Sequence, residues 1–461
     1  MIGVSGVRGI VGEDLDPELV AKFAAAFGQF LAGGLVVVGS DTRPSNEMFR
    51  YALFAGLLST GCEVVDLGIC PTPSLQLMVT GLEAKGGIAI TGSHNPAQWN
   101  ALKFVRPDGL FLYPEQIQKV LGITERRIKR VSWDRIGKVR QEDSAIENHL
   151  KKILPLVDQQ EIRDRHFKVV IDGCNGAGAL ITPELLQRLG CEVVKINCEP
   201  HGYFAHPPEP TRSNLKELSQ IVESEKADIG ISHDADADRV GLVTEKGDIL
   251  PEDYVLLLAA KFILGKKKGL VVTNLSTTQA LDDLAADFDS RVRRTKVGDV
   301  YVARCMRKEK AVIGGEGNGG VIVPEVQYAR DGIAAVALIL NYLAQTGSSL
   351  SLLASSLPRY YMVKRKVKIP PKGFPPPREY LKKQFRAARF NFLDGVKITL
   401  KEGWIHLRSS GTEPVVRIIS EARTRQEAEN LCRIGMEKVL ERSTRSMPFP
   451  LSSTTILSFF I

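Results

Sequence analysis

One serine, Ser93, lies where a short apolar segment gives way to a polar loop. The segment 87–90 (GIAI) predicts a buried strand, and Pro96 prevents the loop from continuing into a helix or a strand. In α/β folds the ends of such strands carry the chemistry, so the Ser93 hydroxyl is placed to carry a phosphate. The simpler alternative is a turn in which Ser93, His94 and Asn95 satisfy neighbouring backbone groups.

Three aspartates follow a second apolar segment, 229–233 (IGISH), at alternate positions. They are Asp234, Asp236 and Asp238, with Arg239 directly after them. Alternation by two would aim the carboxylates at one point, where they repel one another unless a cation neutralises them. A small cluster that leaves room for a phosphate oxygen suits Mg²⁺, whereas the EF-hand loop for Ca²⁺ needs a later glycine and glutamate that are missing here. The spacing predicts a magnesium site, the alternative being a solvated acidic turn.

A glycine-rich segment surrounds Glu316. Its glycines Gly315, Gly317 and Gly320 match the spacing of a dinucleotide-binding fingerprint, but 321–323 (VIV) predicts a strand where that fingerprint needs a helix. Glycines that let the backbone approach a ligand, around one acceptor, suit a polyhydroxylated molecule such as a sugar. A simple glycine-rich hairpin is the alternative.

A fourth polar loop, 408–412 (RSSGT), lies between two alternating apolar segments, and Arg417 follows it. Arginine, hydroxyl groups and glycine backbone amides together are typical of phosphate binding. The alternative is a hairpin turn with incidental arginines.

The first three loops belong to similar stretches of chain. The segments 57–65 (LLSTGCEVV) and 185–194 (LLQRLGCEVV) echo each other, and each predicts a helix end, a glycine cap and a strand. Each stretch delivers one loop, at Ser93, Asp234 or Glu316, at the end of a strand. The repetition predicts three related α/β domains in tandem.

The fourth loop belongs to a smaller unit that follows a proline-rich stretch, 370–377. Beyond it the pattern predicts strands at 396–400, 404–408 and 415–420, and an amphipathic helix at 425–441. We therefore expect an α/β fold of three tandem domains plus a smaller C-terminal α+β domain, with the active site in the central cleft. The expected domains are 1–145, 146–252, 253–366 and 367–445, followed by a tail, 446–461.

Composition narrows the class of ligand. The 461 residues carry 61 Lys and Arg against 53 Asp and Glu, a net charge of +8, and the basic residues are spread rather than clustered with aromatics. This favours an anionic small molecule over nucleic acid. Seven cysteines without C-x-x-C spacing predict reduced thiols, and no apolar run is long enough to span a bilayer. With no secretory signal, we expect a cytoplasmic protein without membrane contact.

Taken in order, TGSHNP, DADADR, GEGNGG and RSSGTEP resemble the four active-site loops of the α-D-phosphohexomutase superfamily. Further matches are GVSGVRG (3–9), SDTRP (40–44), NALK (100–103) and KVGD (296–299), and the resemblance runs to about Arg442. The sugar loop GEGNGG with the following VIVPEVQYARDG looks most like the branch of archaeal-type phosphoglucosamine mutases and related phosphomannomutases. The phosphomannomutase/phosphoglucomutase subgroup usually has Ser-Gly-His after the glutamate. The resemblance also implies mixed sheets in the first three domains.

The resemblance implies an intramolecular phosphotransferase that interconverts hexose 6-phosphate and hexose 1-phosphate. The phosphoryl group would pass through phospho-Ser93 and a hexose 1,6-bisphosphate, which also serves as activator. The substrate implied most directly is glucosamine 6-phosphate, giving glucosamine 1-phosphate. Whether the chain forms a homodimer is left open.

Residue roles follow the same resemblance. The Mg²⁺ ligands would be Ser93, Asp234, Asp236 and Asp238, and the catalytic residues would be Ser93, Arg8, His94, Lys103 and Arg239. The substrate would be bound by Lys296, Glu316, Asn318, Arg408, Ser410, Gly411, Thr412 and Arg417. His94 and Lys103 are both candidates for proton transfer with the sugar hydroxyl, and His94 could equally orient the loop.

Three other functions compete with this assignment. The nearest is a phosphomannomutase or phosphoglucomutase of broad specificity. A non-catalytic sugar-phosphate-binding protein belongs to a different class, but binding alone does not need a phosphorylatable serine beside a metal. A phosphatase would release free phosphate as substrate disappears, which an efficient mutase does not do.

Overall fold

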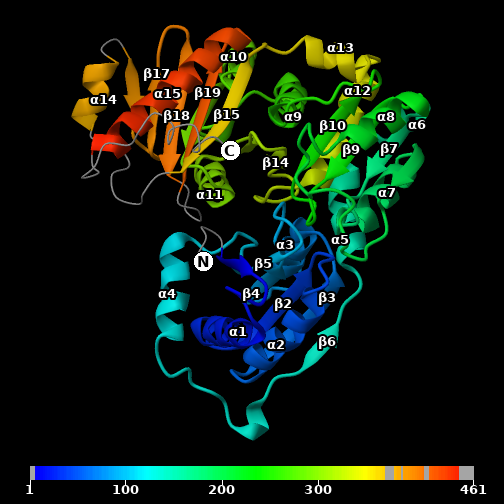
Figure 1. Ribbon diagram of the computed structural model, residues 1–461. Helices are drawn as coiled ribbons and strands as arrows, with labels where there is room; N and C mark the ends of the chain where they lie inside the picture. The colour runs from blue at the N-terminus through cyan, green and yellow to red at the C-terminus, as the bar shows by residue number, and fades with distance from the viewer. Residues whose placement is uncertain (1–5, 369–377, 386–387, 410–414, 446–461) are drawn as a thin grey trace.

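The computed structural model describes residues 6–368, 378–385, 388–409 and 415–445. These residues form four units, each built on its own sheet (Figure 1).

The first unit holds a six-stranded mixed sheet. Its strand order is β1 (Gly6–Ile10), β5 (Trp99–Val105), β4 (Gly86–Ile90), β2 (Gly34–Ser40), β3 (Cys62–Ile69) and β6 (Val139–Gln141), in which β5 is antiparallel to both of its neighbours and the other pairs are parallel. Its helices are α1 (Pro17–Leu31), α2 (Asn46–Leu58), α3 (Thr72–Gly81), α4 (Pro114–Thr124) and the short η1 (Trp133–Arg135). Helix α1 begins where the Asp16 carboxylate accepts a hydrogen bond from Leu19 N, with Pro17 in its first turn.

The second and third units share one plan of three parallel strands and an antiparallel edge strand. The second sheet runs β8 (Glu192–Ile196), β7 (Lys168–Asp172), β9 (Ile229–His233) and β10 (Val240–Thr244), with helices α5 (Ala145–Ile153), η2 (Leu154–Leu156), α6 (Gln159–Asp164), α7 (Gly178–Arg188) and α8 (Lys216–Ser224). The third sheet runs β12 (Arg291–Thr295), β11 (Leu270–Asn274), β13 (Ile313–Glu316) and β14 (Gly320–Ile322), with helices α9 (Asp253–Lys266), α10 (Ala280–Asp287), α11 (Asp299–Glu309), α12 (Gly332–Thr346) and α13 (Leu350–Ser355).

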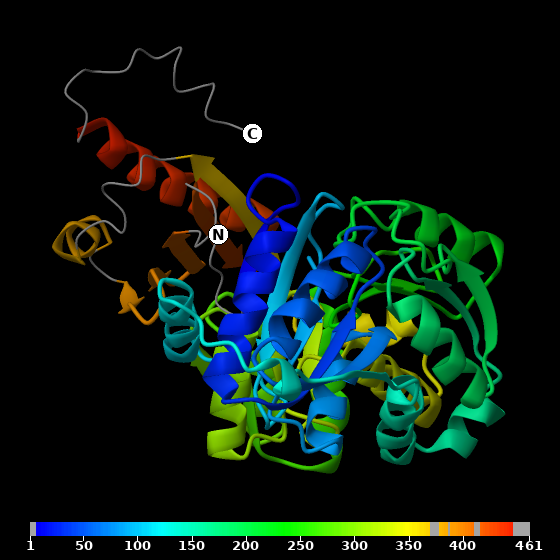
Figure 2. The ribbon, with the colours of Figure 1, turned by 90° about the horizontal axis from the view of Figure 1, so that it is seen from below.

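The fourth unit is an antiparallel sheet covered by one long helix. The strands run β15 (Tyr361–Lys368), β19 (Val415–Ala422), β18 (Gly403–Ser409), β17 (Val396–Thr399) and β16 (Arg389–Asn391), with helices α14 (Arg378–Gln384) and α15 (Arg425–Arg445). In Figure 2 this unit stands to one side of the other three.

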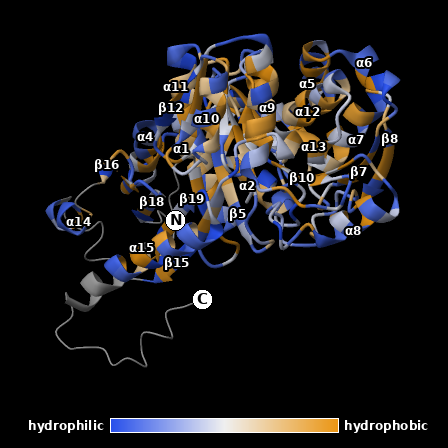
Figure 3. Ribbon diagram, turned by 90° about the horizontal axis from the view of Figure 1, so that it is seen from above, coloured by the Kyte–Doolittle hydropathy of each residue, from blue (hydrophilic) through white to orange (hydrophobic). Residues whose placement is uncertain are grey.

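The apolar cores show which units are fused. One continuous core extends from Leu150 to Leu357 through the second and third units. The first and fourth units each have a core of their own, and smaller clusters join the first unit to the third through Val300 and Leu110. Helices α9 and α12 are the centre of the shared core and are mainly hydrophobic (Figure 3), as expected of helices that are buried on most sides.

These elements confirm the predicted fold class. A strand, not a helix, follows the glycines at 315–320, which removes the dinucleotide-binding reading. All seven cysteines are free. Among the described residues, no helix combines the length and the apolar character needed to cross a membrane.

A buried polar network ties the first three units together. Ser74 Oγ on α3 lies 2.8 Å from Nδ1 of His149 on α5, whose Nε2 lies 2.7 Å from Oδ2 of Asp331, the residue that caps α12. The three side chains have the order of a hydrolase triad, but each is fully buried and none lines the active-site cavity described below. The network therefore holds the three units in position, and Ser74 is not placed to act as a nucleophile on a substrate.

Removing the histidine tests this role. We expect His149→Ala to lower the free energy of unfolding by about 3 kcal/mol, because the buried Asp331 carboxylate loses its partner. The midpoint of thermal unfolding would fall by several degrees, while His201→Ala, at a side chain that is 45% exposed, would leave it unchanged. Equal midpoints for the two variants would contradict the role.

Candidate active site

Ser93 lies in the loop between β4 and β5 and is only 2% exposed. Its φ of 49° is in the left-handed region, which a residue other than glycine adopts only where its surroundings hold it. Ser93 N donates a hydrogen bond to Thr91 Oγ1 (2.8 Å), and Ser93 Oγ donates one to Asp234 Oδ2 (2.8 Å). The loop thus fixes the hydroxyl against the aspartate cluster of the second unit.

A fully buried arginine, Arg43, holds this loop from beneath. Its guanidinium pairs with Asp41 and donates to the backbone carbonyls of Ser93 (2.6 Å), Asn95 (2.7 Å), Pro96 (2.7 Å) and Trp99 (2.9 Å). Gly92 makes room for it, since a Cβ there would lie 2.7 Å from Arg43 Cζ. Five interactions of one rigid fork therefore set the conformation of the Ser93 loop.

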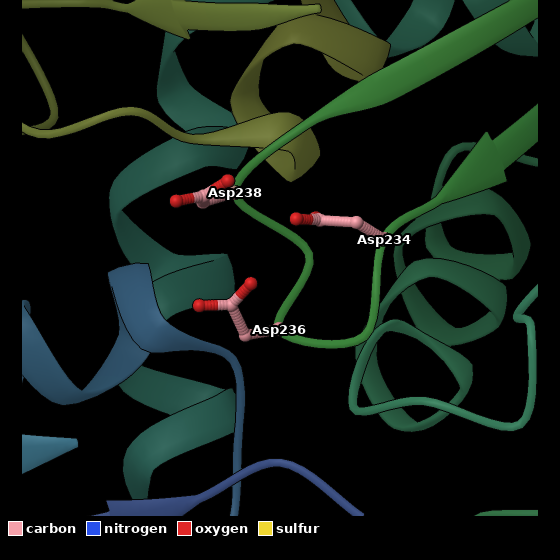
Figure 4. Close-up of side chains that lie close together, drawn as sticks. All are labelled: Asp234, Asp236 and Asp238. Carbon is pink, nitrogen blue, oxygen red and sulfur yellow. The ribbon is translucent and has the colours of Figure 1, made fainter. Parts of the chain in front are cut away.

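The three aspartates converge in the loop between β9 and β10 (Figure 4). One carboxylate oxygen from each lies within 4.8 Å of the others, and all three side chains are buried. The prediction that they meet is confirmed, but the reason is different from strand alternation. The chain turns here, with Ala237 at a φ of 55°, and the turn brings the carboxylates together.

The cluster has unused acceptors that fit a cation. Asp236 Oδ1 and Asp238 Oδ1 are buried and accept no hydrogen bond within the described ranges. Burial, with the charges of Asp238 and Asp236, raises the pKa of Asp234 well above its ordinary value. Burial would also raise the pKa of Asp236, but Lys103 holds it below its ordinary value. Hard carboxylate oxygens without donors are what Mg²⁺ requires, so the donor set fits this ion.

Cations from all three α/β units surround the cluster. Lys103 Nζ on β5 lies 2.7 Å from Asp236 Oδ2, Arg239 Nε lies 3.7 Å from Asp238 Oδ1, and Arg330 Nη2 lies 2.6 Å from Asp238 Oδ2. Burial disfavours the charge of Lys103, yet Asp236 and Asp238 outweigh it and raise its pKa. Arg8, on β1, also lines the site, and burial together with Arg239 lowers its pKa.

His94 is held as a neutral ring. Arg239 Nη2 donates a hydrogen bond to His94 Nδ1 (2.8 Å), and Ser93 Oγ lies 3.5 Å from the same nitrogen. Burial and the charges of Arg239 and Arg8 keep the pKa of His94 well below its ordinary value. The ring nitrogen that faces Ser93 therefore already accepts a hydrogen bond from Arg239.

Glu316 ends β13 and is only 4% exposed. Its Oε1 accepts hydrogen bonds from Asn274 Nδ2 (2.7 Å) and Gly298 N (2.9 Å), and its Oε2 accepts one from Arg330 Nη1 (3.2 Å). These donors fix the carboxylate at the cavity wall, and Asn318 also lines the cavity.

Two arginines of the fourth unit lie opposite each other on neighbouring strands. Arg408 on β18 pairs in register with Arg417 on β19, and both line the cavity. Arg408 Nε lies 2.9 Å from Asp394 Oδ2, which orients the guanidinium. Ser410, Gly411 and Thr412, predicted to bind phosphate with them, lie outside the described residues.

One cavity of about 710 Å³ joins these groups. All four units contribute to its lining, for example through Ser93, Arg239, Glu316 and Arg408. Among the described residues, this lining includes seven Lys or Arg and four Asp or Glu. The excess of cations suits a ligand with more than one phosphate.

Family models match nearly the whole chain in the same order as these units. They are described as phosphoglucomutase/phosphomannomutase alpha/beta/alpha domains I (residues 1–130), II (147–247) and III (251–361) and the C-terminal domain (362–434). The chain belongs to the phosphoglucomutase/phosphomannomutase family. It is therefore an isomerase that acts as an intramolecular phosphotransferase, a phosphohexomutase, as the sequence predicted.

Individual relatives agree with this family. A "Phosphoglucomutase/phosphomannomutase" of Thermococcus kodakarensis is 41% identical, covering 96% of this chain and 99% of the relative. A "Probable phosphoglucosamine mutase" of Methanopyrus kandleri is 39% identical over 93% of this chain and 95% of its own. A solved phosphoglucomutase/phosphomannomutase family protein from Burkholderia thailandensis has a TM-score of 0.85 at 27% identity, covering 98% of this chain and 100% of its own.

The phosphohexomutase structure brings together most of the residues predicted for the site. The cavity lining includes Arg8, Ser93, His94, Lys103, Arg239, Glu316, Asn318, Arg408 and Arg417, with the three aspartates directly behind Ser93 and Lys103. Lys296 differs, because its side chain is exposed, is not part of this lining, and places Nζ 5.8 Å from the ring centre of Tyr301.

Sequence reasoning did not assign roles to Arg43, Thr72, Asn274 and Arg330. Arg43 stands in the SDTRP match and Arg330 in the stretch VIVPEVQYARDG, so their positions carried a signal. The sequence contained no signal for the partners of these side chains, because they form bonds with residues that are far away in the sequence. Thr72 Oγ1, for example, donates to Asp236 Oδ2 (2.6 Å).

Arg43 offers a test of the loop. We expect Arg43→Lys to lower kcat by roughly 100-fold, because one ammonium cannot hold four carbonyls and the serine moves by a fraction of an ångström. The dissociation constant for sugar phosphate, measured by calorimetry, should change little. Arg140→Lys, at a side chain that is 54% exposed, is the matched control. A kcat equal to that of the control would rule out this role for Arg43.

Proposed function

We propose that this phosphohexomutase converts glucosamine 6-phosphate into glucosamine 1-phosphate and back, through phosphorylated Ser93 and a 1,6-bisphosphate intermediate. The observation that carries the proposal is the contact between Ser93 Oγ and Asp234 Oδ2 at 2.8 Å, beside carboxylate oxygens that accept no hydrogen bond from the described part of the chain. A serine in this position can hold a phosphoryl group next to a divalent cation.

Mg²⁺ would be held by Asp234, Asp236, Asp238 and an oxygen of phosphorylated Ser93. When bound, the ion would neutralise charge on the transferring phosphoryl group. Lys103 and Arg330 already occupy one oxygen each of Asp236 and Asp238 and leave the others available.

The chain's own residues would do the rest by positioning. The bond between phosphorus and Ser93 Oγ breaks as a new bond forms to the free hydroxyl of the sugar. The proton of that hydroxyl passes to Ser93 Oγ, with His94 and Lys103 as the two candidates for relaying it, so that Ser93 is left with a free hydroxyl. Arg8, Lys103 and Arg239 are placed to offset the charge that develops, whereas Arg408 and Arg417, with Ser410, Gly411 and Thr412, would hold the phosphate that does not react. The bisphosphate then turns, and its other phosphate returns to Ser93.

Three features support an amino sugar as substrate. The glycine-rich loop around Glu316 lacks the Ser-Gly-His of the mannose and glucose subgroup, and a 39% identical relative is named as a phosphoglucosamine mutase. The cavity lining also offers the carboxylates of Glu209, Asp299 and Glu316 to a substrate ammonium. Glu316 would hydrogen-bond ring hydroxyls, with Asn318 as a further sugar contact.

Broad specificity is the second candidate. It is favoured by the 41% identical relative, which is named for glucose and mannose phosphates.

Phosphorus NMR separates the two candidates. Purified protein would be incubated with Mg²⁺, a trace of hexose 1,6-bisphosphate, and glucosamine, glucose or mannose 6-phosphate in parallel. We expect kcat/KM for glucosamine 6-phosphate to exceed the others at least tenfold, which corresponds to about 1.4 kcal/mol of transition-state discrimination. Comparable rates would make the enzyme a broad-specificity mutase, and a rise in free phosphate would indicate hydrolysis instead.

Ser93→Ala tests the covalent intermediate. We expect the variant to lose isomerisation, because no hydroxyl remains to carry the phosphoryl group, while sugar-phosphate binding persists. Labelled hexose bisphosphate should phosphorylate the wild-type chain but not the variant, with the exposed Ser355→Ala as control. Label on the Ser93→Ala chain would refute the assignment.

A further inference from the structure

Arg330 is the cation that links two loops: the metal loop, 234–239, which carries the three aspartates, and the sugar loop, 315–320, which carries Glu316. It lies just before α12, and its side chain is 9% exposed. Nη2 lies 2.6 Å from Asp238 Oδ2 in the metal loop and 3.4 Å from Asp299 Oδ2, while Nη1 lies 3.2 Å from Glu316 Oε2 in the sugar loop. One planar group therefore sets the separation of two carboxylates that belong to different units.

Gly320 makes space for this arginine. A Cβ at position 320 would lie 2.3 Å from Arg330 Cδ, closer than atoms can approach, and 3.1 Å from Arg330 Cγ, which is a tight contact. The backbone of Gly320 is not in the left-handed region, so its conformation does not demand glycine. The absence of a side chain at 320 is therefore explained by the volume that Arg330 fills.

The backbone around Arg330 is fixed to both loops. Arg330 pairs with Ile322 beyond the sugar loop, and Gly332 N donates a hydrogen bond to Ala237 O in the metal loop (3.2 Å). The metal loop also bonds the sugar loop directly, from Val240 N to Gly319 O (3.1 Å). The backbone that carries the guanidinium is therefore fixed by hydrogen bonds, and the length of the Arg330 side chain sets the distance between Glu316 and Asp238.

We propose that Arg330 is a positioning residue for phosphoryl transfer, which holds Glu316 at a set distance from Asp238, and that the glycine at 320 is required to admit it. The inference rests on the proposed function, in which Glu316 holds the sugar and Asp238 the metal. While Arg330 contacts both Asp238 and Glu316, the sugar hydroxyl is held in line with the phosphoryl group. When the contacts of Arg330 to Asp238 and Glu316 are weakened, the substrate still binds through its phosphate to Arg408 and Arg417, but it reacts from a less favourable geometry.

Two variants disturb the contacts of Arg330 in different ways, one by changing Arg330 itself and one by changing Gly320 beside it. Arg330→Lys keeps the charge but cannot span two carboxylates, and Gly320→Ala pushes the arginine away without touching the ligand, because Gly320 is not among the residues that line the cavity. For each we expect kcat to fall about 10- to 100-fold while KM for sugar phosphate changes less than about threefold. The double variant should be no slower than the slower single variant, because both disturb one contact.

The control is Gly265→Ala on α9, where the nearest atom to the new Cβ is 3.9 Å away. The proposal is overturned if Arg330→Lys keeps the wild-type kcat. It is also overturned if KM rises with kcat unchanged, which would make Arg330 a direct binding group, or if both variants only lower the thermal midpoint. A wild-type protein without turnover would instead refute the proposed function, so the two failures are distinguishable.

Discussion

Three carboxylates that are buried against one another form the constraint on which the rest of the structure depends. Asp234, Asp236 and Asp238 are almost inaccessible to water, and like charges so placed repel strongly unless cations compensate them. The compensation comes from Lys103 in the first unit, Arg239 in the second and Arg330 in the third. The charge of the metal loop is therefore compensated by cations from all three units.

The topology explains how residues so far apart in sequence reach this point. In each α/β unit the functional loop joins a parallel strand to its antiparallel neighbour, as in β4 to β5, β9 to β10 and β13 to β14. The three loops leave their sheets at equivalent ends and meet at one centre. Thr72 N, for example, donates to Asp236 O (3.1 Å), so the first unit also bonds the metal loop through its backbone.

The sequence predicted the fold class and located the loops around Ser93, Asp234 and Glu316 because both depend on local pattern. Other residues that line the cavity, such as Arg8 and Lys103, were predicted from the family resemblance. Apolar segments, glycines and clustered polar residues indicated where strands end and which loops carry chemistry. Three-dimensional detail was less accessible: Ala237 turns the metal loop, and the exposed Lys296 lies near Tyr301 rather than on the cavity wall. The partners of Arg43 and Arg330 are distant in sequence, so the pattern located these residues without revealing their bonds.

The fourth unit is attached in a different way from the other three. Its contacts with the third unit include hydrogen bonds from Lys397 Nζ to Leu275 O (2.8 Å) and between His406 Nδ1 and Ser276 Oγ (2.9 Å), whereas the second and third units share an apolar core. Polar contacts can be exchanged for water at small net cost, but separating an apolar core exposes surface worth about 25 cal/mol per Å². In the proposed reaction a bisphosphate must be released from one wall before it turns. Arg408 and Arg417 lie on the unit with polar attachments, so moving that wall would cost less than separating the metal loop from Arg330, because the metal loop and Arg330 belong to units that share one apolar core.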